Sequence, residues 1–168
     1  MINYYDWAEY QSKMHSNKIA ITDYSLNKKI SYKELNISSC KLANFLQARG
    51  IGHSNRVAIL SKNHSIFFEL QFACSKIGSI MVPLNWRLTA NELAFILNDC
   101  EPSLLIVDDC FKAIADQLRS LTPTIMIQFF SSDEKPSEFQ ENINGCLSDF
   151  ERVPLSLDDL IMIMYTSG

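Results

Sequence analysis

Residues 63–108 read NHSIFFELQFACSKIGSIMVPLNWRLTANELAFILNDCEPSLLIVD, and this stretch decides the fold class. Apolar residues recur three and four positions apart over 65–78 and again over 90–100, which predicts two helices. Short apolar runs over 79–84 and 104–107 predict two buried strands. Strands that alternate with helices in this way are typical of β–α–β units, in which neighbouring strands run parallel.

The same alternation extends toward both ends of the chain. Two capping boxes indicate where helices begin, one formed by Ser31 with Glu34 and the other by Thr89 with Glu92. The sequence therefore predicts one α/β domain, with a layered and largely parallel sheet flanked by helices. The other predicted elements are helices over 3–15, 31–50 and 108–121, a short helix near 138–150, a strand over 18–23 that forms a hairpin with Ile30, and strands over 56–61, 124–130 and 159–165.

The composition is that of an ordinary globular domain and argues against several classes of protein. The 168 residues include 15 Lys and Arg against 19 Asp and Glu, and the net charge of −4 gives no electrostatic footprint for DNA or RNA. The longest apolar run, Leu160–Tyr165, is far shorter than the roughly 20 residues of a membrane helix. The N-terminal MINYYDWAEYQ has no basic region, so we expect no signal peptide and a cytoplasmic protein.

Residue types that often perform chemistry lack the spacing that such chemistry needs. The cysteines form no C-x-x-C and predict reduced, mostly buried thiols, while the histidines have no metal-ligand spacing. The G-I-G at 50–52 lacks a third glycine and follows a helix, so we interpret it as a helix cap and not a dinucleotide-binding turn. The acidic pairs at 108–109 and 158–159 stand at element boundaries, where Asp caps well, and no metal site is predicted. The cysteines and histidines considered are Cys40, Cys74, Cys100, Cys110, Cys146, His15, His53 and His64.

The last four residues are Tyr165-Thr166-Ser167-Gly168, and Tyr165 is also the last residue of the apolar run. A strand that delivers hydroxyls and a glycine into a turn is how phosphate loops begin, because backbone N–H groups of the turn converge on an anion. From the residues alone, a phosphate loop and an ordinary turn are equally open.

Four stretches resemble the AMP-forming acyl-CoA synthetases of the adenylate-forming superfamily, and the first is the predicted helix over 3–15, which lies where the family has its opening helix. Residues 30–60, ISYKELNISSCKLANFLQARGIGHSNRVAIL, are similar to the family's block T-Y-x-E-L … G-V-x-x-G-D-x-V-A, with Asn55 in place of the usual Asp. Residues 63–108 are similar to its block A-x-x-x-x-G-A-x-x-x-P-L-N-x-R, with Ser79 in place of the usual Ala. Residues 158–168, DDLIMIMYTSG, resemble the strand that enters the phosphate loop Y-T-S-G-T-T-G-x-P-K.

The resemblance implies an enzyme that activates a carboxylic acid, most often a fatty acid, with ATP to an acyl-adenylate and then transfers the acyl group to coenzyme A. Thr166, Ser167 and Gly168 would begin the loop that binds the ATP phosphates, with Mg²⁺ as the accompanying ion. The P-L-N-W-R at 83–87 favours an acyl-CoA synthetase over a peptide-synthetase adenylation domain. Asn85 and Arg87 are interpreted as structural residues of a turn, with a role near the coenzyme A path as the alternative.

The resemblance covers nearly all of this chain but only the opening third of a family member. Residues 1–168 would be the N-terminal portion of the adenylating domain, without the rest of that domain or the C-terminal domain. No catalytic residue of the family falls within the chain, so we expect the chain alone to be inactive and its exposed apolar face to promote self-association. Two alternatives stay open: another adenylate-forming enzyme, such as an adenylation domain or a luciferase-like oxidase, and a non-catalytic α/β interaction module.

Overall fold

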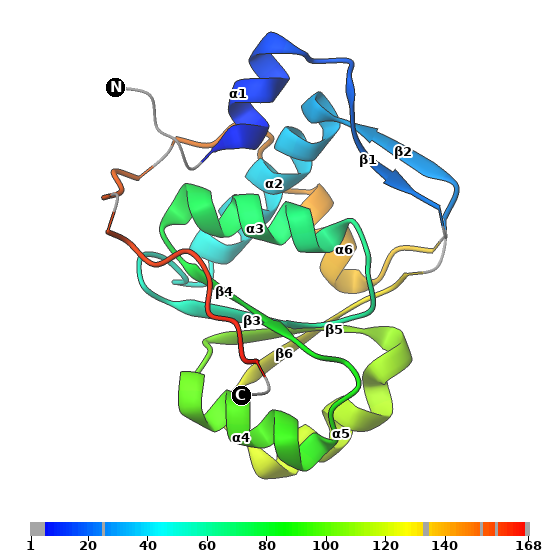
Figure 1. The fold of residues 1–168 in the computed structure, drawn as a ribbon, viewed down its shortest axis with the longest axis vertical. Helices are drawn as coiled ribbons and strands as arrows, with labels where there is room; N and C mark the ends of the chain where they lie inside the picture. The colour runs from blue at the N-terminus through cyan, green and yellow to red at the C-terminus, as the bar shows by residue number, and fades with distance from the viewer. Residues whose placement is uncertain (1–5, 25, 133–134, 152, 157, 167–168) are drawn as a thin grey trace.

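The computed structural model describes residues 6–24, 26–132, 135–151, 153–156 and 158–166. These residues form a parallel sheet with the strand order β4-β3-β5-β6 and a separate two-stranded hairpin (Figure 1). The strands of the sheet are β3 (Arg56–Leu60), β4 (Ile80–Leu84), β5 (Leu104–Asp108) and β6 (Met126–Phe130), and the hairpin strands are β1 (Ile19–Asp23) and β2 (Lys28–Ser31). The predicted α/β architecture with a largely parallel sheet is confirmed.

Helices cover both faces of the sheet. In Figure 1, α2, α3 and α6 lie on one face, whereas α4 and α5 lie on the other. A helix α1 and the hairpin pack beyond α2 and α3. The helices are α1 (Trp7–Met14), α2 (Tyr32–Gln47), α3 (Ile66–Ile77), α4 (Ala90–Cys100), α5 (Lys112–Leu121), which follows a 3-10 turn at Asp109–Phe111, and α6 (Glu138–Asn144).

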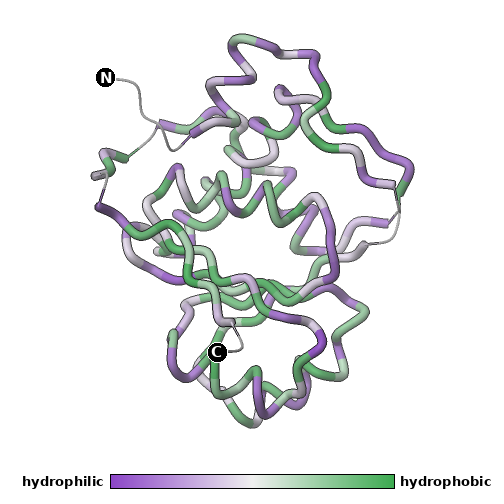
Figure 2. The backbone as a smooth tube through the Cα atoms, viewed as in Figure 1, coloured by the Kyte–Doolittle hydropathy of each residue, from purple (hydrophilic) through white to green (hydrophobic). Residues whose placement is uncertain are grey.

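Strand β3 shows why the layers form. Val57 and Ile59 pack into the core under α2 and α3, while Ala58 and Leu60 pack into the core over α4 and α5. All four side chains are fully buried, and burying a side chain the size of Val, Ile or Leu stabilises the fold by about 1.5–3 kcal/mol. Figure 2 shows hydrophobic residues concentrated along the strands and hydrophilic residues at the outer turns. After Arg56 the strand is apolar on both faces, as predicted for a parallel sheet, and it therefore sits between two helical layers.

Local sequence signals set the helix starts. Both predicted capping boxes are present: Glu34 N–H donates to Ser31 Oγ at 3.2 Å, and Glu92 N–H donates to Thr89 Oγ1 at 3.4 Å. The carboxylate of each Glu accepts the backbone N–H of its cap residue in return, at 2.8 Å in both cases. Gly50, with φ of 75°, ends the turn after α2 in the left-handed conformation that the cap interpretation expects.

The predicted strand over 159–165 is wrong as a full strand. It makes a single parallel bridge, in which Met81 N–H donates to the Ile161 carbonyl and Ile163 N–H donates to the Met81 carbonyl. The next residue of β4 that faces this edge is Pro83, which has no N–H to continue the ladder. The helix predicted near 138–150 is also shorter than expected and spans Glu138–Asn144.

A buried ion pair joins the N-cap residue of α1 to α3. Lys76 Nζ lies 2.6 Å from Asp6 Oδ2, and both side chains are at most 2% exposed. Lys76 also donates to Asn36 Oδ1 at 2.9 Å, while Asp6 Oδ1 caps α1 by accepting the Glu9 N–H at 3.0 Å. The start of the described chain is therefore fixed by charge and hydrogen bonding in addition to apolar packing.

Candidate functional site

The order of the strands identifies the edge of the sheet where a site is expected. β3 and β5 are neighbours at the centre of the sheet, but the chain leaves β3 toward α3 on one face and leaves β5 toward α5 on the other. Ligands of open α/β sheets bind at the carboxyl ends of strands whose connections diverge in this way. The residues that follow β3, β4 and β5 are therefore the candidates.

Asp108 is the last residue of β5, where the two connections diverge, but its hydrogen bonds stabilise the fold. Its buried carboxylate accepts the Cys110 N–H at 3.1 Å, the Ser132 hydroxyl at 3.2 Å and the Ser61 hydroxyl at 3.4 Å. The capping role predicted for this Asp is confirmed. Desolvation, together with the Asp108 carboxylate, raises the pKa of the Cys110 thiol to about 11, so this thiol is protonated near neutral pH and is a poor nucleophile.

The prediction that the cysteine thiols are mostly buried is confirmed in part. Cys40, Cys74 and Cys100 are buried, whereas Cys110 is exposed and Cys146 is half-buried. Burial raises the pKa of Cys74 to about 12. Buried, protonated thiols are inert packing groups and not catalytic ones.

Two cations lie over the indole ring of Trp86, which belongs to the turn after β4. Arg87 Cζ lies 4.4 Å from the centre of the Trp86 ring, and Lys62 Nζ from the turn after β3 lies 5.6 Å from it. Asn85 Oδ1 accepts the Arg87 N–H at 3.1 Å, which closes an Asx turn. These contacts give Asn85 and Arg87 the turn-forming role that was expected of them.

The C-terminal segment crosses the edge of the sheet and reaches the α4 layer (Figure 1). Asp159 Oδ1 lies 3.3 Å from His53 Nε2, and the Tyr165 hydroxyl donates to Asp99 Oδ2 at 2.5 Å. Thr166 is exposed directly after this anchor. Ser167 and Gly168 lie outside the described residues, so the assignment of these three residues to a phosphate loop stays a prediction.

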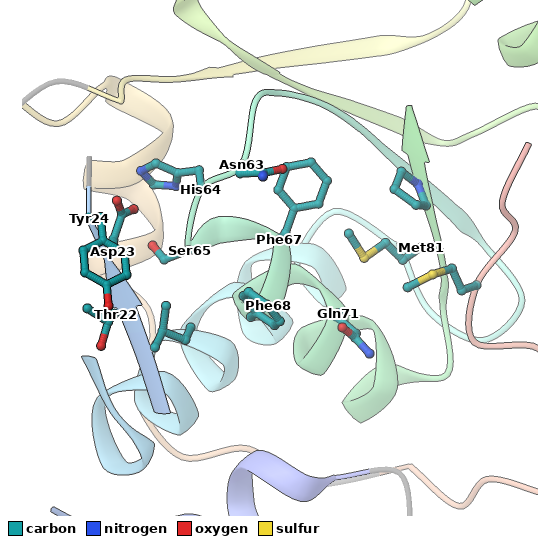
Figure 3. Close-up of a pocket in the computed structure, with 13 residues that line it drawn as sticks. Thr22, Asp23, Tyr24, Asn63, His64, Ser65, Phe67, Phe68, Gln71 and Met81 are labelled. Atoms are coloured by element: carbon teal, nitrogen blue, oxygen red, sulfur yellow. The ribbon is translucent and has the colours of Figure 1, made fainter. Parts of the chain in front are cut away.

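A groove of about 740 Å³ lies between the hairpin and α3 (Figure 3). Phe67 and Phe68 of α3 supply apolar walls, and Met81 lines the far end beside the C-terminal segment. His64 lies at the other end, where burial lowers the pKa of its imidazole and its Nδ1 accepts the Ile66 N–H at 3.1 Å. The groove is therefore an apolar hollow with a neutral imidazole at one end.

Sequence reasoning missed a carboxyl group in a second cavity of about 350 Å³, between α2, α3 and α6. Glu69 lines this cavity and accepts the Ser65 hydroxyl at 3.2 Å. Burial raises the pKa of Glu69, while the Ser65 bond and the charge of Lys28 oppose the shift. A Glu in a helix reads the same in the sequence whether it is solvated or buried, so no signal could have identified it.

The described residues offer neither a cluster of metal ligands nor a membrane-spanning helix. No group of three or more His, Cys, Asp or Glu side chains in that part of the chain is placed to hold a metal ion. None of its helices combines the length and hydrophobicity that crossing a bilayer requires.

The fold is that of the N-terminal domain of an adenylate-forming enzyme. The N-terminal domain of FACL13 from Mycobacterium tuberculosis superposes with a TM-score of 0.88 and 26% identity, over 99% of this chain and 42% of that one. Residues 8–168 match the AMP-binding enzyme family, and the chain belongs to that family. The family resemblance inferred from the sequence is thus confirmed.

Curated relatives have the names of acid–thiol ligases. The long-chain-fatty-acid–CoA ligase FadD13 of Mycobacterium tuberculosis is 30% identical over 89% of this chain and 29% of its own length. The crotonobetaine/carnitine–CoA ligase of Proteus mirabilis is 30% identical over 94% of this chain and 32% of its own length. The fatty acid–[acyl-carrier-protein] ligase ScoC of Streptomyces coeruleorubidus is 35% identical over 58% of this chain. The chain spans at most about a third of the length of these relatives.

Proposed function

We propose that the protein to which this chain belongs is an AMP-forming acid–thiol ligase. The observation that supports this most directly is the placement of Thr166 in a chain of the AMP-binding family. Thr166 is exposed immediately after a segment that is bonded to the edge of β4 and to α4. Hydroxyl and glycine residues in a turn at that position would direct donors at a phosphate group.

The proposed reaction has two steps. A carboxylate oxygen of the acid attacks the α-phosphorus of ATP, the bond to the bridging oxygen breaks, and pyrophosphate leaves with the electron pair. The sulfur of the acceptor thiol then attacks the acyl carbon, AMP leaves, and the thiol proton passes to solvent. Thr166, Ser167 and Gly168 would hold the β- and γ-phosphates and so stabilise the charge on departing pyrophosphate.

Mg²⁺ would enter this reaction with ATP. Carboxylate oxygens are the protein ligands that Mg²⁺ prefers. Among the described residues no acidic cluster is placed to bind a metal, so none of these side chains is assigned to the ion.

We propose a fatty acid as the substrate and coenzyme A as the acceptor. Two relatives named above support the fatty-acid assignment, because one is a long-chain-fatty-acid–CoA ligase and the other a fatty acid–[acyl-carrier-protein] ligase. The name of the second relative gives an acyl-carrier protein as the acceptor, so the acceptor has to be determined by experiment. Full-length protein should be assayed with fatty, aromatic and short-chain acids, each with coenzyme A and with holo-acyl-carrier protein. A location in the cytoplasm is proposed as well, and cell fractionation tests it.

The activity is tested by ATP–pyrophosphate exchange on two forms of the protein. We expect the 168-residue chain to be inactive and the full-length protein encoded by its source gene to exchange pyrophosphate in the presence of acid. Exchange by the 168-residue chain well above the blank would overturn the proposed inactivity. A full-length protein that is folded but inactive with every acid would overturn the ligase proposal.

The apolar groove supports a second candidate, an association surface. Phe68 lines the groove and is 48% exposed, and Tyr24 at its rim is 91% exposed. Sedimentation of the 168-residue chain at high concentration should show self-association that Phe68→Ser weakens. Phe95→Ser is the matched control, because Phe95 is 74% exposed on α4, on the opposite face of the sheet. A strictly monomeric chain, or equal effects of the two variants, would contradict this role.

A further inference from the structure

The segment that leads to Thr166 is anchored at three points in succession. Asp159 pairs with His53 at 3.3 Å. The parallel bridge between Met162 and Met81 then holds the segment to the edge of β4. The third anchor is the hydrogen bond from the Tyr165 hydroxyl to Asp99. This third anchor is the last one before Thr166, so it has the greatest control over where the following turn begins.

The Tyr165 anchor combines packing with a charged hydrogen bond. The Tyr165 ring is half-buried against the core of the α4 and α5 layer, and its hydroxyl donates to Asp99 Oδ2 at 2.5 Å. A hydrogen bond to a carboxylate is roughly twice as strong as a neutral one. Burial and the Asp99 bond raise the pKa of Tyr165, so the hydroxyl keeps its proton and remains a donor throughout the physiological pH range.

Asp99 is itself held in place from the sheet. It lies in the last turn of α4, whose Leu93 and Leu97 are fully buried. Arg56 of β3 ties down the end of that helix, because its Nε donates to the Cys100 carbonyl at 2.7 Å and its Nη2 donates to the Glu101 carbonyl at 3.0 Å. A continuous set of contacts therefore runs from β3 through the end of α4 to Tyr165.

We propose that Asp99 is a positioning residue for the phosphate loop, acting through Tyr165 to fix the backbone at Thr166. The inference rests on the proposed function, since it concerns the loop that would hold ATP. Asp99 does not touch the phosphates. Its effect is to set the starting point of the turn that does, and a misplacement of about 1 Å at such a turn costs on the order of 10²-fold in rate.

Four single variants and one double variant separate positioning from a general effect on folding. Asp99→Ala and Tyr165→Phe each remove one side of the hydrogen bond, whereas Asp99→Asn retains an acceptor oxygen. Asn98→Ala is the matched control, because Asn98 is the neighbouring exposed residue on α4. The double variant D99A/Y165F tests whether the two residues act together, since a shared interaction makes their effects non-additive.

Two readouts are expected to change together. In the 168-residue chain, backbone ¹⁵N order parameters of Tyr165 and Thr166 should fall in D99A and Y165F, from near ~0.85 toward ~0.6, and should stay near wild type in D99N and N98A. In the full-length protein, D99A and Y165F should raise KM for ATP, so that kcat/KM for ATP falls by up to about 10²-fold, and should leave KM for the acid unchanged. The double variant should be no worse than either single variant.

Different results of these two measurements would contradict different proposals. Order parameters that are the same in D99A and in wild type would overturn the proposal. An unchanged KM for ATP in an active D99A enzyme would overturn it as well. A wild-type full-length protein without exchange activity would contradict the proposed function, while the order parameters would still decide whether Asp99 fixes Thr166.

Discussion

The buried pair between Lys76 and Asp6 allows a sharp test of what stabilises this domain. Lys76→Met preserves most of the side-chain volume but leaves the Asp6 carboxylate in a site where only 1% of it is exposed. Removing one partner of a buried ion pair costs about 3–5 kcal/mol, because the remaining charge loses its compensation. That is a large part of the roughly 5–15 kcal/mol that holds a domain folded. For a chain of this size it corresponds to a fall in Tm of about 6–20 °C.

The assay is urea unfolding followed by far-UV circular dichroism, with two companion variants. Lys13→Met is the surface control, because Lys13 pairs with Glu9 in the same helix but its side chain is 71% exposed. Such exposed pairs contribute about 0–1 kcal/mol. In Asp6→Asn/Lys76→Met the buried charge is removed and Asn still caps α1, so this double variant should regain part of the loss. A loss below about 1 kcal/mol in K76M, equal to that in K13M, would refute the reasoning.

Three further predictions concern neighbouring sites in α3 and just after it. Gly78→Ala should lower the free energy of unfolding by about 1–3 kcal/mol, because φ is 71° and a Cβ would lie 2.7 Å from Leu155 and 2.8 Å from His53; thermal unfolding measures this. Ser79→Ala should raise stability by about 1 kcal/mol in urea titrations, since this buried hydroxyl has no hydrogen-bonding oxygen or nitrogen partner among the described residues. The raised pKa of Glu69 means that the folded state holds its proton more tightly, so stability should fall as pH rises above about 4.5; Glu69→Gln should flatten that slope in unfolding curves measured across pH.

Local signals in the sequence were sufficient for most of the elements and their order, and the strand expected over 159–165 is the exception. The capping boxes at Ser31 and Thr89 depend on residues three positions apart, so the sequence contains all the information they need. The apolar run of β3 likewise reports burial on both faces. The layered α/β fold follows from such short-range patterns, because parallel strands need helical crossovers on their faces.

Contacts between distant residues were beyond the reach of the sequence. Lys76 and Asp6 are 70 positions apart, and nothing in either neighbourhood indicates that they meet. The same holds for Asp99, which lies 66 positions before Tyr165 and looks like an ordinary helix-end acid. Thr166 could be proposed as a phosphate-loop residue from its motif, but the residue that holds it in place could not.

Pro83 explains why a side-chain hydrogen bond is needed to hold the C-terminal segment at Tyr165. A backbone ladder along β4 would fix the C-terminal segment residue by residue, but the missing N–H of Pro83 ends the ladder after the Met81 bridge. Beyond Ile163 the segment has no further bridge to β4 within the described residues. The Tyr165 hydroxyl therefore replaces the backbone bond that the sheet does not supply. A ladder is made by the main chain and survives most substitutions, whereas this anchor depends on two side chains. The position of Thr166 should for that reason be unusually sensitive to single substitutions at Asp99 or Tyr165.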